Sequence, residues 1–217
     1  MSSKKILLLG GNGPMSVKLL QCFLKQGHNV RPTVRENTTN VQKLLLNKFN
    51  GVVCNCDEDY QNVINEFKPN FIIDTIPKFC ESLTNLVLAT NDCFKISFSS
   101  PASDFARVCP EKCPTGSYPM DKLCLEKEVN ARGKSHKDAI IFQIGFMTEL
   151  AVIDDEPICS GLSFDTMVKC NLSKFNDASI PDFDLSKGFT CTPIENICKL
   201  VGDCINDKMV ISNGAFG

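Results

Sequence analysis

The chain has 217 residues, and its 23 lysines and arginines against 25 aspartates and glutamates give a formal net charge of -2 at pH 7. This length suits a single domain over residues 1–217, and the absence of a long basic run excludes an obvious nucleic-acid partner. The apolar run after Lys5 is too short for a signal peptide or a membrane span, so we expect a cytoplasmic protein with no membrane partner.

The thirteen cysteines do not indicate a disulfide framework or a metal site. Without a secretory signal, a reducing cytosol is expected, and most of the thiols should be free and buried. The closest pairs are Cys54 with Cys56 and Cys109 with Cys113, and neither has the repeated spacing of a zinc module. We therefore expect no metal ion.

The first structural unit runs from Lys5 to Arg35. An apolar strand at residues 6–9 is followed by a glycine-rich turn at residues 10–16, a helix that ends at Gly27, and a second strand at residues 28–35. An uninterrupted apolar run is typical of a strand that is buried on both faces of a parallel sheet. This unit therefore predicts a strand, a turn and a crossover helix that returns to the same sheet.

The same alternation continues along the chain. Strands are predicted at residues 50–57, 71–76, 94–99 and 139–144, and helices at residues 59–67, 82–90 and 120–129. Such alternation predicts right-handed crossovers and an α/β fold, a three-layer, doubly wound parallel sheet of the Rossmann type. Ligands of these sheets bind at the carboxyl ends of the strands.

The turn resembles a dinucleotide-binding fingerprint, with the spacing G-x-x-G-x-x-S from Gly10 to Ser16. Ser16 stands where the fingerprint has a third glycine, and a plain structural turn remains the alternative. A helix N-terminus behind such a turn offers free N–H groups to a pyrophosphate. The residues expected to contact a nicotinamide dinucleotide are Gly10, Asn12, Gly13, Pro14, Met15, Thr75 and Ile76.

Two residues at strand ends bear on the choice of cofactor. Arg35 follows the second strand, where an acidic residue would bind the ribose of NAD, so a guanidinium there favours the extra phosphate of NADP. A solvated surface arginine is the alternative, and NAD stays open. Asp57, after the third strand, would bind the adenine amino group or simply begin the next helix.

Tyr118 and Lys122 are the candidates for chemistry. Residues four apart share a helix face, so both side chains can point at one ligand. A nearby ammonium is expected to lower the pKa of the phenol, so that it can exchange a proton with a carbonyl or alcohol oxygen. The alternative is the start of an amphipathic helix with Pro119 in its first turn.

With these motifs the chain resembles the short-chain dehydrogenase/reductase superfamily, in its extended or atypical branches. The resemblance spans most of the chain, from Gly10-x-x-Gly13-x-x-Ser16 through Ser99-Ser100 and Tyr118-x-x-x-Lys122 to the segment Phe189–Ile197. By position, it implies that Ser100 or Ser99 polarises the substrate oxygen, that Tyr118 is the general acid/base, and that Lys122 tunes it and holds the cofactor ribose.

The resemblance implies an NADP(H)-dependent oxidoreductase or epimerase acting on a carbonyl or secondary alcohol of a small molecule such as a nucleotide sugar. The alternative is a non-catalytic NADP-binding sensor or regulatory subunit, like the NmrA-like proteins. Gln143-Ile144-Gly145 replaces the Arg-Pro-Gly usual in such relatives, and residues 146–188 leave room for only a small substrate-capping segment. Relatives often dimerise through helices beside the sheet, so a homodimer is one expected state.

Overall fold

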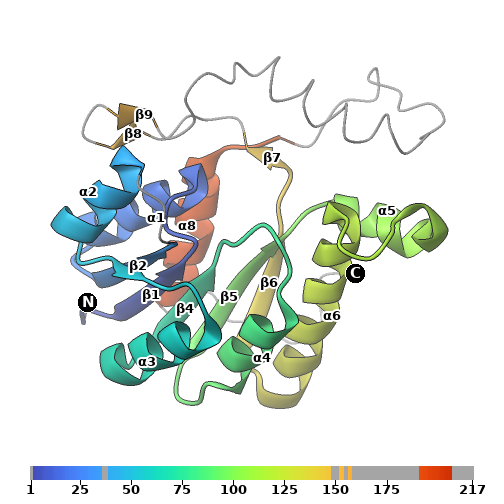
Figure 1. The fold of residues 1–217 in the computed structure, drawn as a ribbon, viewed down its shortest axis with the longest axis horizontal. Coiled ribbons are helices and arrows are strands. Elements are labelled where there is room, and N and C mark those ends of the chain that lie inside the picture. Colours follow the sequence, from blue (N-terminus) through green and yellow to red (C-terminus); the bar gives the residue numbers. More distant parts are fainter. Residues whose placement is uncertain (1, 36–38, 148–151, 154–155, 158–190, 207–217) are drawn as a thin grey trace.

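The computed structural model describes residues 2–35, 39–147, 152–153, 156–157 and 191–206. Its centre is a six-stranded, fully parallel sheet with the strand order β3-β2-β1-β4-β5-β6 (Figure 1). This is the order of the doubly wound dinucleotide-binding folds, and it confirms the predicted fold class. The strands are β1 (Lys5–Leu9), β2 (Asn29–Val34), β3 (Val52–Val53), β4 (Phe71–Asp74), β5 (Phe94–Ser99) and β6 (Ala139–Gln143).

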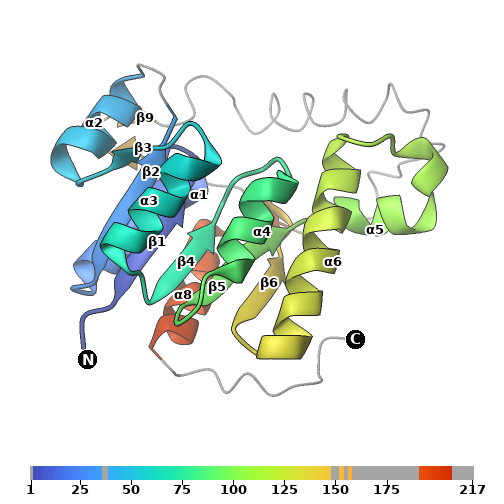
Figure 2. The same ribbon diagram turned by 60° about the horizontal axis from the view of Figure 1, so that its bottom comes forward.

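Helices cover both faces of the sheet, which makes the three layers visible in Figure 2. The helices α3, α4 and α6 lie on one face, and α1 and α8 lie on the other. Their bounds, with those of the remaining helical elements, are α1 (Pro14–Lys25), α2 (Asn40–Lys48), α3 (Asp57–Phe67), α4 (Glu81–Ala89), α5 (Ala102–Val108), the 3-10 turn η1 (Pro110–Lys112), α6 (Tyr118–His136) and α8 (Ile194–Ile205).

The alternation of side chains along β1 builds both halves of the core. Ile6 and Leu8 pack with α1 and α8, while Leu7 and Leu9 pack with α3 and α4. All four side chains are completely buried. This is the arrangement that an uninterrupted apolar run predicts for a central strand.

The cysteine side chains that the structure describes are all free thiols. The buried ones are Cys54, Cys93, Cys113, Cys198 and Cys204. Of the described residues, none lies in a helix both long and apolar enough to cross a membrane.

The segment 146–188, predicted to cap the substrate site, lies almost entirely outside the described residues. Its described parts are β7 (Phe146–Met147), β8 (Val152–Ile153) and β9 (Glu156–Pro157). β7 pairs in parallel with β10 (Cys191–Thr192), so the chain returns to this point just before α8.

Candidate functional site

The glycine-rich turn follows β1 at the carboxyl edge of the sheet and leads directly into α1. Gly10 has a φ of +74°, and a Cβ added there would lie 3.1 Å from both Ile76 Cγ1 and Thr75 Oγ1. The turn is closed by the Gly13 N–H, which donates to the Gly10 carbonyl oxygen over 3.3 Å. Glycine at position 10 is therefore required both by the backbone conformation and by the close approach of the segment after β4.

Helix α1 begins without a side-chain cap. Gly13 is the N-cap residue and has no side chain that could accept a hydrogen bond from the first N–H groups, and Pro14 occupies the first turn. Asn12 is exposed beside them, whereas Met15 is buried. The start of α1 thus keeps donor groups and a partial positive charge for an anion.

Ser16 has a structural role that the sequence motif did not reveal. Its side chain is 1% exposed, and its hydroxyl donates to the Gly10 carbonyl oxygen over 2.8 Å. Ser16 Oγ also lies within hydrogen-bond distance of Thr75 Oγ1, which in turn bonds the Leu9 carbonyl oxygen. The two hydroxyls fasten the glycine turn to the ends of β1 and β4, a contact that glycine could not make.

Arg35 and Asp57 follow the neighbouring strands at the same edge. Arg35 is exposed, and its guanidinium has no hydrogen-bond or ion-pair partner among the residues that the structure describes. Asp57 is exposed in the first turn of α3, where a carboxylate favours the helix dipole. The alternative that Asp57 begins the next helix therefore holds, and it leaves the carboxylate at the site edge.

Tyr118, Ser100 and Lys122 come together at the carboxyl end of β5. A side-chain hydrogen bond joins Tyr118 to Ser100, and Lys122 Nζ lies 5.7 Å from the centre of the Tyr118 ring. Lys122 is 6% exposed and donates to the Phe98 carbonyl oxygen over 3.0 Å. The predicted sharing of one helix face by Tyr118 and Lys122 is thus present in the structure.

We expected the Lys122 ammonium to lower the pKa of the Tyr118 phenol, and the structure does not show that lowering. Tyr118 is 46% exposed; the burial of the rest of its side chain raises its pKa, and the hydrogen bond with Ser100 opposes that rise. Burial lowers the pKa of Lys122, while the charges of Asp74, Asp121 and Glu126 oppose that change. Lys122 Nζ donates to the Phe98 carbonyl oxygen and also lies over the Tyr118 ring, and this proximity does not bring the pKa of the phenol below its usual value.

The structure separates the two serines that the resemblance left as alternatives. The Ser99 hydroxyl donates to Glu126, whose carboxylate is buried within α6. Ser100 is instead the serine that contacts Tyr118. The Ser99 hydroxyl is therefore used in a buried hydrogen bond, whereas Ser100 lies beside the Tyr118 phenol.

Two carboxylates near Lys122 went unrecognised in the sequence. Asp74, at the end of β4, accepts a hydrogen bond from the Ile76 N–H over 2.9 Å, and burial raises its pKa against the opposing effects of that bond and of Lys122. Glu126 lies four residues after Lys122, on the same face of α6. That i,i+4 spacing is a signal in the sequence that could have indicated a role for Glu126.

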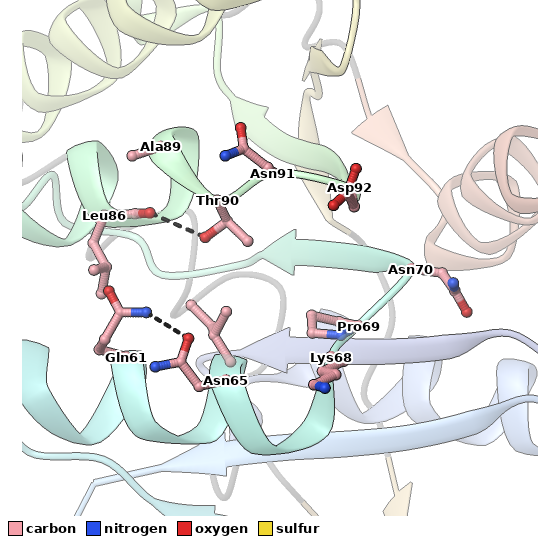
Figure 3. Close-up of a pocket in the computed structure, with 11 residues that line it drawn as sticks. Gln61, Asn65, Lys68, Pro69, Asn70, Leu86, Ala89, Thr90, Asn91 and Asp92 are labelled. Atoms are coloured by element: carbon pink, nitrogen blue, oxygen red, sulfur yellow. Dashed lines mark hydrogen bonds between the residues drawn. The ribbon is translucent and has the colours of Figure 1, made fainter.

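A cavity of about 640 Å³ lies at the opposite edge of the sheet (Figure 3). Gln61 and Asn65 of α3, the residues before β4, and Thr90 to Asp92 before β5 line it. Because these segments precede the strands whose carboxyl ends carry Thr75 and Ser100, the cavity is separate from the candidate site.

No protein-family model matches this sequence, and no curated protein is recognisably similar to it. Solved structures are similar in fold. Vestitone reductase from alfalfa has 14% identity and a TM-score of 0.64, with 95% of this chain and 74% of that chain covered. A short-chain dehydrogenase/reductase (wide type) from Veillonella parvula, in complex with NADP, has 12% identity and a TM-score of 0.57, with 94% of this chain and 88% of that chain covered.

A dTDP-glucose 4,6-dehydratase from Bacillus anthracis, in complex with NAD, has 11% identity and a TM-score of 0.63, with 96% of this chain and 73% of that chain covered. At such identities the similarity concerns the fold. It confirms, for the fold, the resemblance to short-chain dehydrogenases/reductases that the sequence motifs indicate.

Proposed function

We propose that this protein is an NADP(H)-dependent oxidoreductase or epimerase of the short-chain dehydrogenase/reductase type, acting on a carbonyl or secondary alcohol. The main support is that the uncapped start of α1 and the Tyr118–Ser100–Lys122 group lie at the same carboxyl edge of one parallel sheet. A dinucleotide bound across that edge would connect a diphosphate site with a proton-transfer site.

The residues at the edge fit such a cofactor. The absence of a side chain at Gly10 lets the turn pack against Thr75 and Ile76, and the turn residues Asn12, Gly13, Pro14 and Met15 lead the chain into the first turn of α1, whose N-cap residue makes no side-chain hydrogen bond. The exposed guanidinium of Arg35, which has no hydrogen-bond or ion-pair partner among the described residues, suits the additional phosphate of NADP. Asp57 would face the adenine, and Thr75 and Ile76 would form the wall beside the turn. When bound, the nicotinamide supplies or accepts hydride.

The chain's own groups would then handle the substrate oxygen. Tyr118 would donate or accept the proton, and Ser100 would hold the oxygen by a hydrogen bond. Lys122 would bind the ribose hydroxyls of the cofactor. Its ammonium donates to the Phe98 carbonyl oxygen, so it would either bind both groups at once or give up that hydrogen bond. Because burial keeps the pKa of Tyr118 high, the phenol stays protonated at neutral pH and is suited to the direction that reduces a carbonyl.

The class of substrate is inferred from proteins that share the fold. The dTDP-glucose 4,6-dehydratase named above shares this fold. A nucleotide sugar is therefore the first substrate class to test.

A second candidate function is that of a non-catalytic NADP-binding sensor. The hydrogen bond from Lys122 to the Phe98 carbonyl oxygen favours it, because it engages the ammonium that an enzyme of this type would need for the cofactor ribose. Both functions require the same cofactor site, and only turnover distinguishes them.

The test compares wild type with Tyr118→Phe, using NADPH consumption over a panel of carbonyl substrates and NADPH binding by fluorescence. We expect turnover to fall by roughly 10²–10⁴-fold with NADPH affinity unchanged, since only the proton donor is lost. Tyr60→Phe is the matched control, because Tyr60 is the only other tyrosine and is buried against Thr33. Wild-type NADPH binding without any turnover would support the sensor and contradict the enzyme.

A further inference from the structure

A buried carboxylate lies at the middle of α6, two helical turns after Tyr118. Glu126 is 7% exposed, and its spacing from Lys122 places it on the same face of the helix as the catalytic candidates. A buried carboxylate is costly unless its oxygens are fully hydrogen-bonded, so the partners of Glu126 are informative.

Both oxygens of Glu126 are occupied by groups from other elements. Oε1 accepts hydrogen bonds from Ser99 Oγ, at the end of β5, and from Ser103 Oγ of α5 over 2.5 Å. Oε2 accepts a hydrogen bond from the Arg107 guanidinium over 2.6 Å. One side chain of α6 thus joins the end of β5 to two residues of α5.

The residues that Glu126 holds flank Ser100 on both sides. The Ser103 N–H and hydroxyl each lie 2.9 Å from the Ser100 carbonyl oxygen, and the Ala102 N–H donates to Ser100 Oγ over 3.3 Å. Ser100 itself makes the side-chain hydrogen bond with Tyr118. The position of Ser100 relative to α6 is therefore set through Ser99 and Ser103.

Outer contacts reinforce the same turn. Arg107 also pairs with Asp104, and the Gln143 amide at the end of β6 donates to Asp104 over 3.0 Å. These contacts are exposed and are expected to contribute little to stability. The Gln143 amide also lies 3.5 Å from the Ser100 carbonyl oxygen and 3.4 Å from Ser103 Oγ, so Glu126 is the buried charged contact of a turn that Gln143 touches from β6.

We propose that Glu126 is a positioning residue that holds the turn 99–103 against α6 and thereby places Ser100 beside Tyr118. The inference rests on the proposed function, which gives Ser100 and Tyr118 their roles. Glu126 acts through the serines that flank Ser100 and does not itself contact the phenol.

The test uses the phenol of Tyr118 as a reporter and needs no substrate. The chain has no tryptophan and two tyrosines, so in a Tyr60→Phe background the ultraviolet titration of tyrosinate reports Tyr118 alone. Burial raises the pKa of Tyr118, and the side-chain hydrogen bond with Ser100 lowers it. A change in that pKa therefore reports the contact with Ser100.

In this background we expect Ser100→Ala to raise the pKa of Tyr118 by about half a unit to one unit, the effect of losing one hydrogen bond. Glu126→Leu should raise it by a similar amount, and the double variant should show no further rise. Glu128→Gln, at an exposed position of the same helix, is the control and should leave the pKa unchanged.

A folded Glu126→Leu protein with an unchanged phenol pKa, alongside a raised value in Ser100→Ala, would overturn the positioning role while leaving the proposed function standing. If Glu126→Leu does not fold, Glu126→Gln replaces it, because the amide oxygen still accepts from the serines but faces Arg107 without charge. A smaller rise is then expected, and no rise would refute the inference. An unchanged pKa in Ser100→Ala would instead remove the Ser100–Tyr118 pair from the proposed function.

Discussion

His28 is a buried imidazole in the turn between α1 and β2, at the edge of the sheet remote from the candidate site. It is 5% exposed, and its Nδ1 accepts a hydrogen bond from the Lys4 N–H over 3.4 Å. Within the described part of the chain, its Nε2 atom is buried without a partner. Burial lowers the pKa of His28, and the charge of Lys4 adds to this effect.

The lowered pKa predicts a loss of stability on acidification. The unfolded chain binds the proton near pH ~6.5 and the folded chain only at lower pH, so the free energy of unfolding falls as the pH drops through that window. In His28→Leu, this fall should become shallower, whereas His136→Leu, at an exposed site, should retain the wild-type slope. Urea unfolding at a series of pH values measures both, and identical slopes in the three proteins would contradict the assignment.

At the residue scale, the sequence identified candidate site residues more reliably than the contacts that those residues make. Tyr118, Lys122 and the glycines were found because their spacing follows the helix period or a turn requirement. Glu126 and Asp74 were not recognised, because their importance comes from contacts with residues distant in the chain. The raised pKa of Tyr118 could not be predicted either, since burial and the direction of the Lys122 amine depend on the packing of α6 against β5.

Helix α1 is fastened to the sheet at its first turn by Ser16. The hydroxyl bridges the Gly10 carbonyl and the Thr75 hydroxyl, and the whole side chain is enclosed. Ser16 stands where the dinucleotide fingerprint has a glycine that allows close packing. Its hydroxyl instead forms hydrogen bonds that join the turn to the end of β4.

Ser16→Ala should therefore lower the free energy of unfolding by about 1–3 kcal/mol, because the buried Gly10 and Thr75 groups lose a partner. Ser135→Ala is a suitable control, since the Ser135 hydroxyl bonds the Ala131 carbonyl at the exposed end of α6. That variant should change stability by less than about 0.5 kcal/mol. Equal losses in the two variants, measured by chemical denaturation, would refute a special role for Ser16.

At the element scale, the six strands of the central sheet were predictable, although the third was expected at residues 50–57 and spans only Val52–Val53, and the helices α2 and α5 were not predicted. The strands of the central sheet are apolar runs bounded by glycine, proline or asparagine, which is a strong local signal. In contrast, α2 begins with a capping box between Thr39 and Gln42 but presents few buried residues, and α5 has seven residues. Short helices with little apolar periodicity leave a weak pattern.

Helix α6 also extends beyond its predicted end at residue 129, through Gly133 to His136. Gly133 would suggest a helix end from sequence alone. In the structure it lies against β6, where an added Cβ would be 2.6 Å from the Ala139 carbonyl oxygen. This glycine permits close packing between a helix and a strand rather than ending the helix.

At the scale of the whole molecule, the strand order explains why the distant motifs meet. β1 lies beside β4, and β4 beside β5, so the turn after β1, Thr75 after β4 and Ser100 after β5 follow adjacent parallel strands. The opposite edge carries structural groups instead, including the completely buried Lys95, which pairs with Asp138 over 2.7 Å. The sequence predicted this division, because alternating strands and helices define one ligand edge.

The central claim is that the turn at residues 10–16 binds the diphosphate of NADP, and calorimetric titration with NADPH tests it most directly. Gly10 and Gly27 have φ values of +74° and +80°, so alanine strains the backbone at both, but only at Gly10 would the new Cβ meet Ile76 and Thr75. The account predicts that wild type and Gly27→Ala bind NADPH equally and that Gly10→Ala binds at least about ten-fold more weakly, a loss of about 1.4 kcal/mol. Equal affinities in all three proteins, or no binding by wild type, would contradict it.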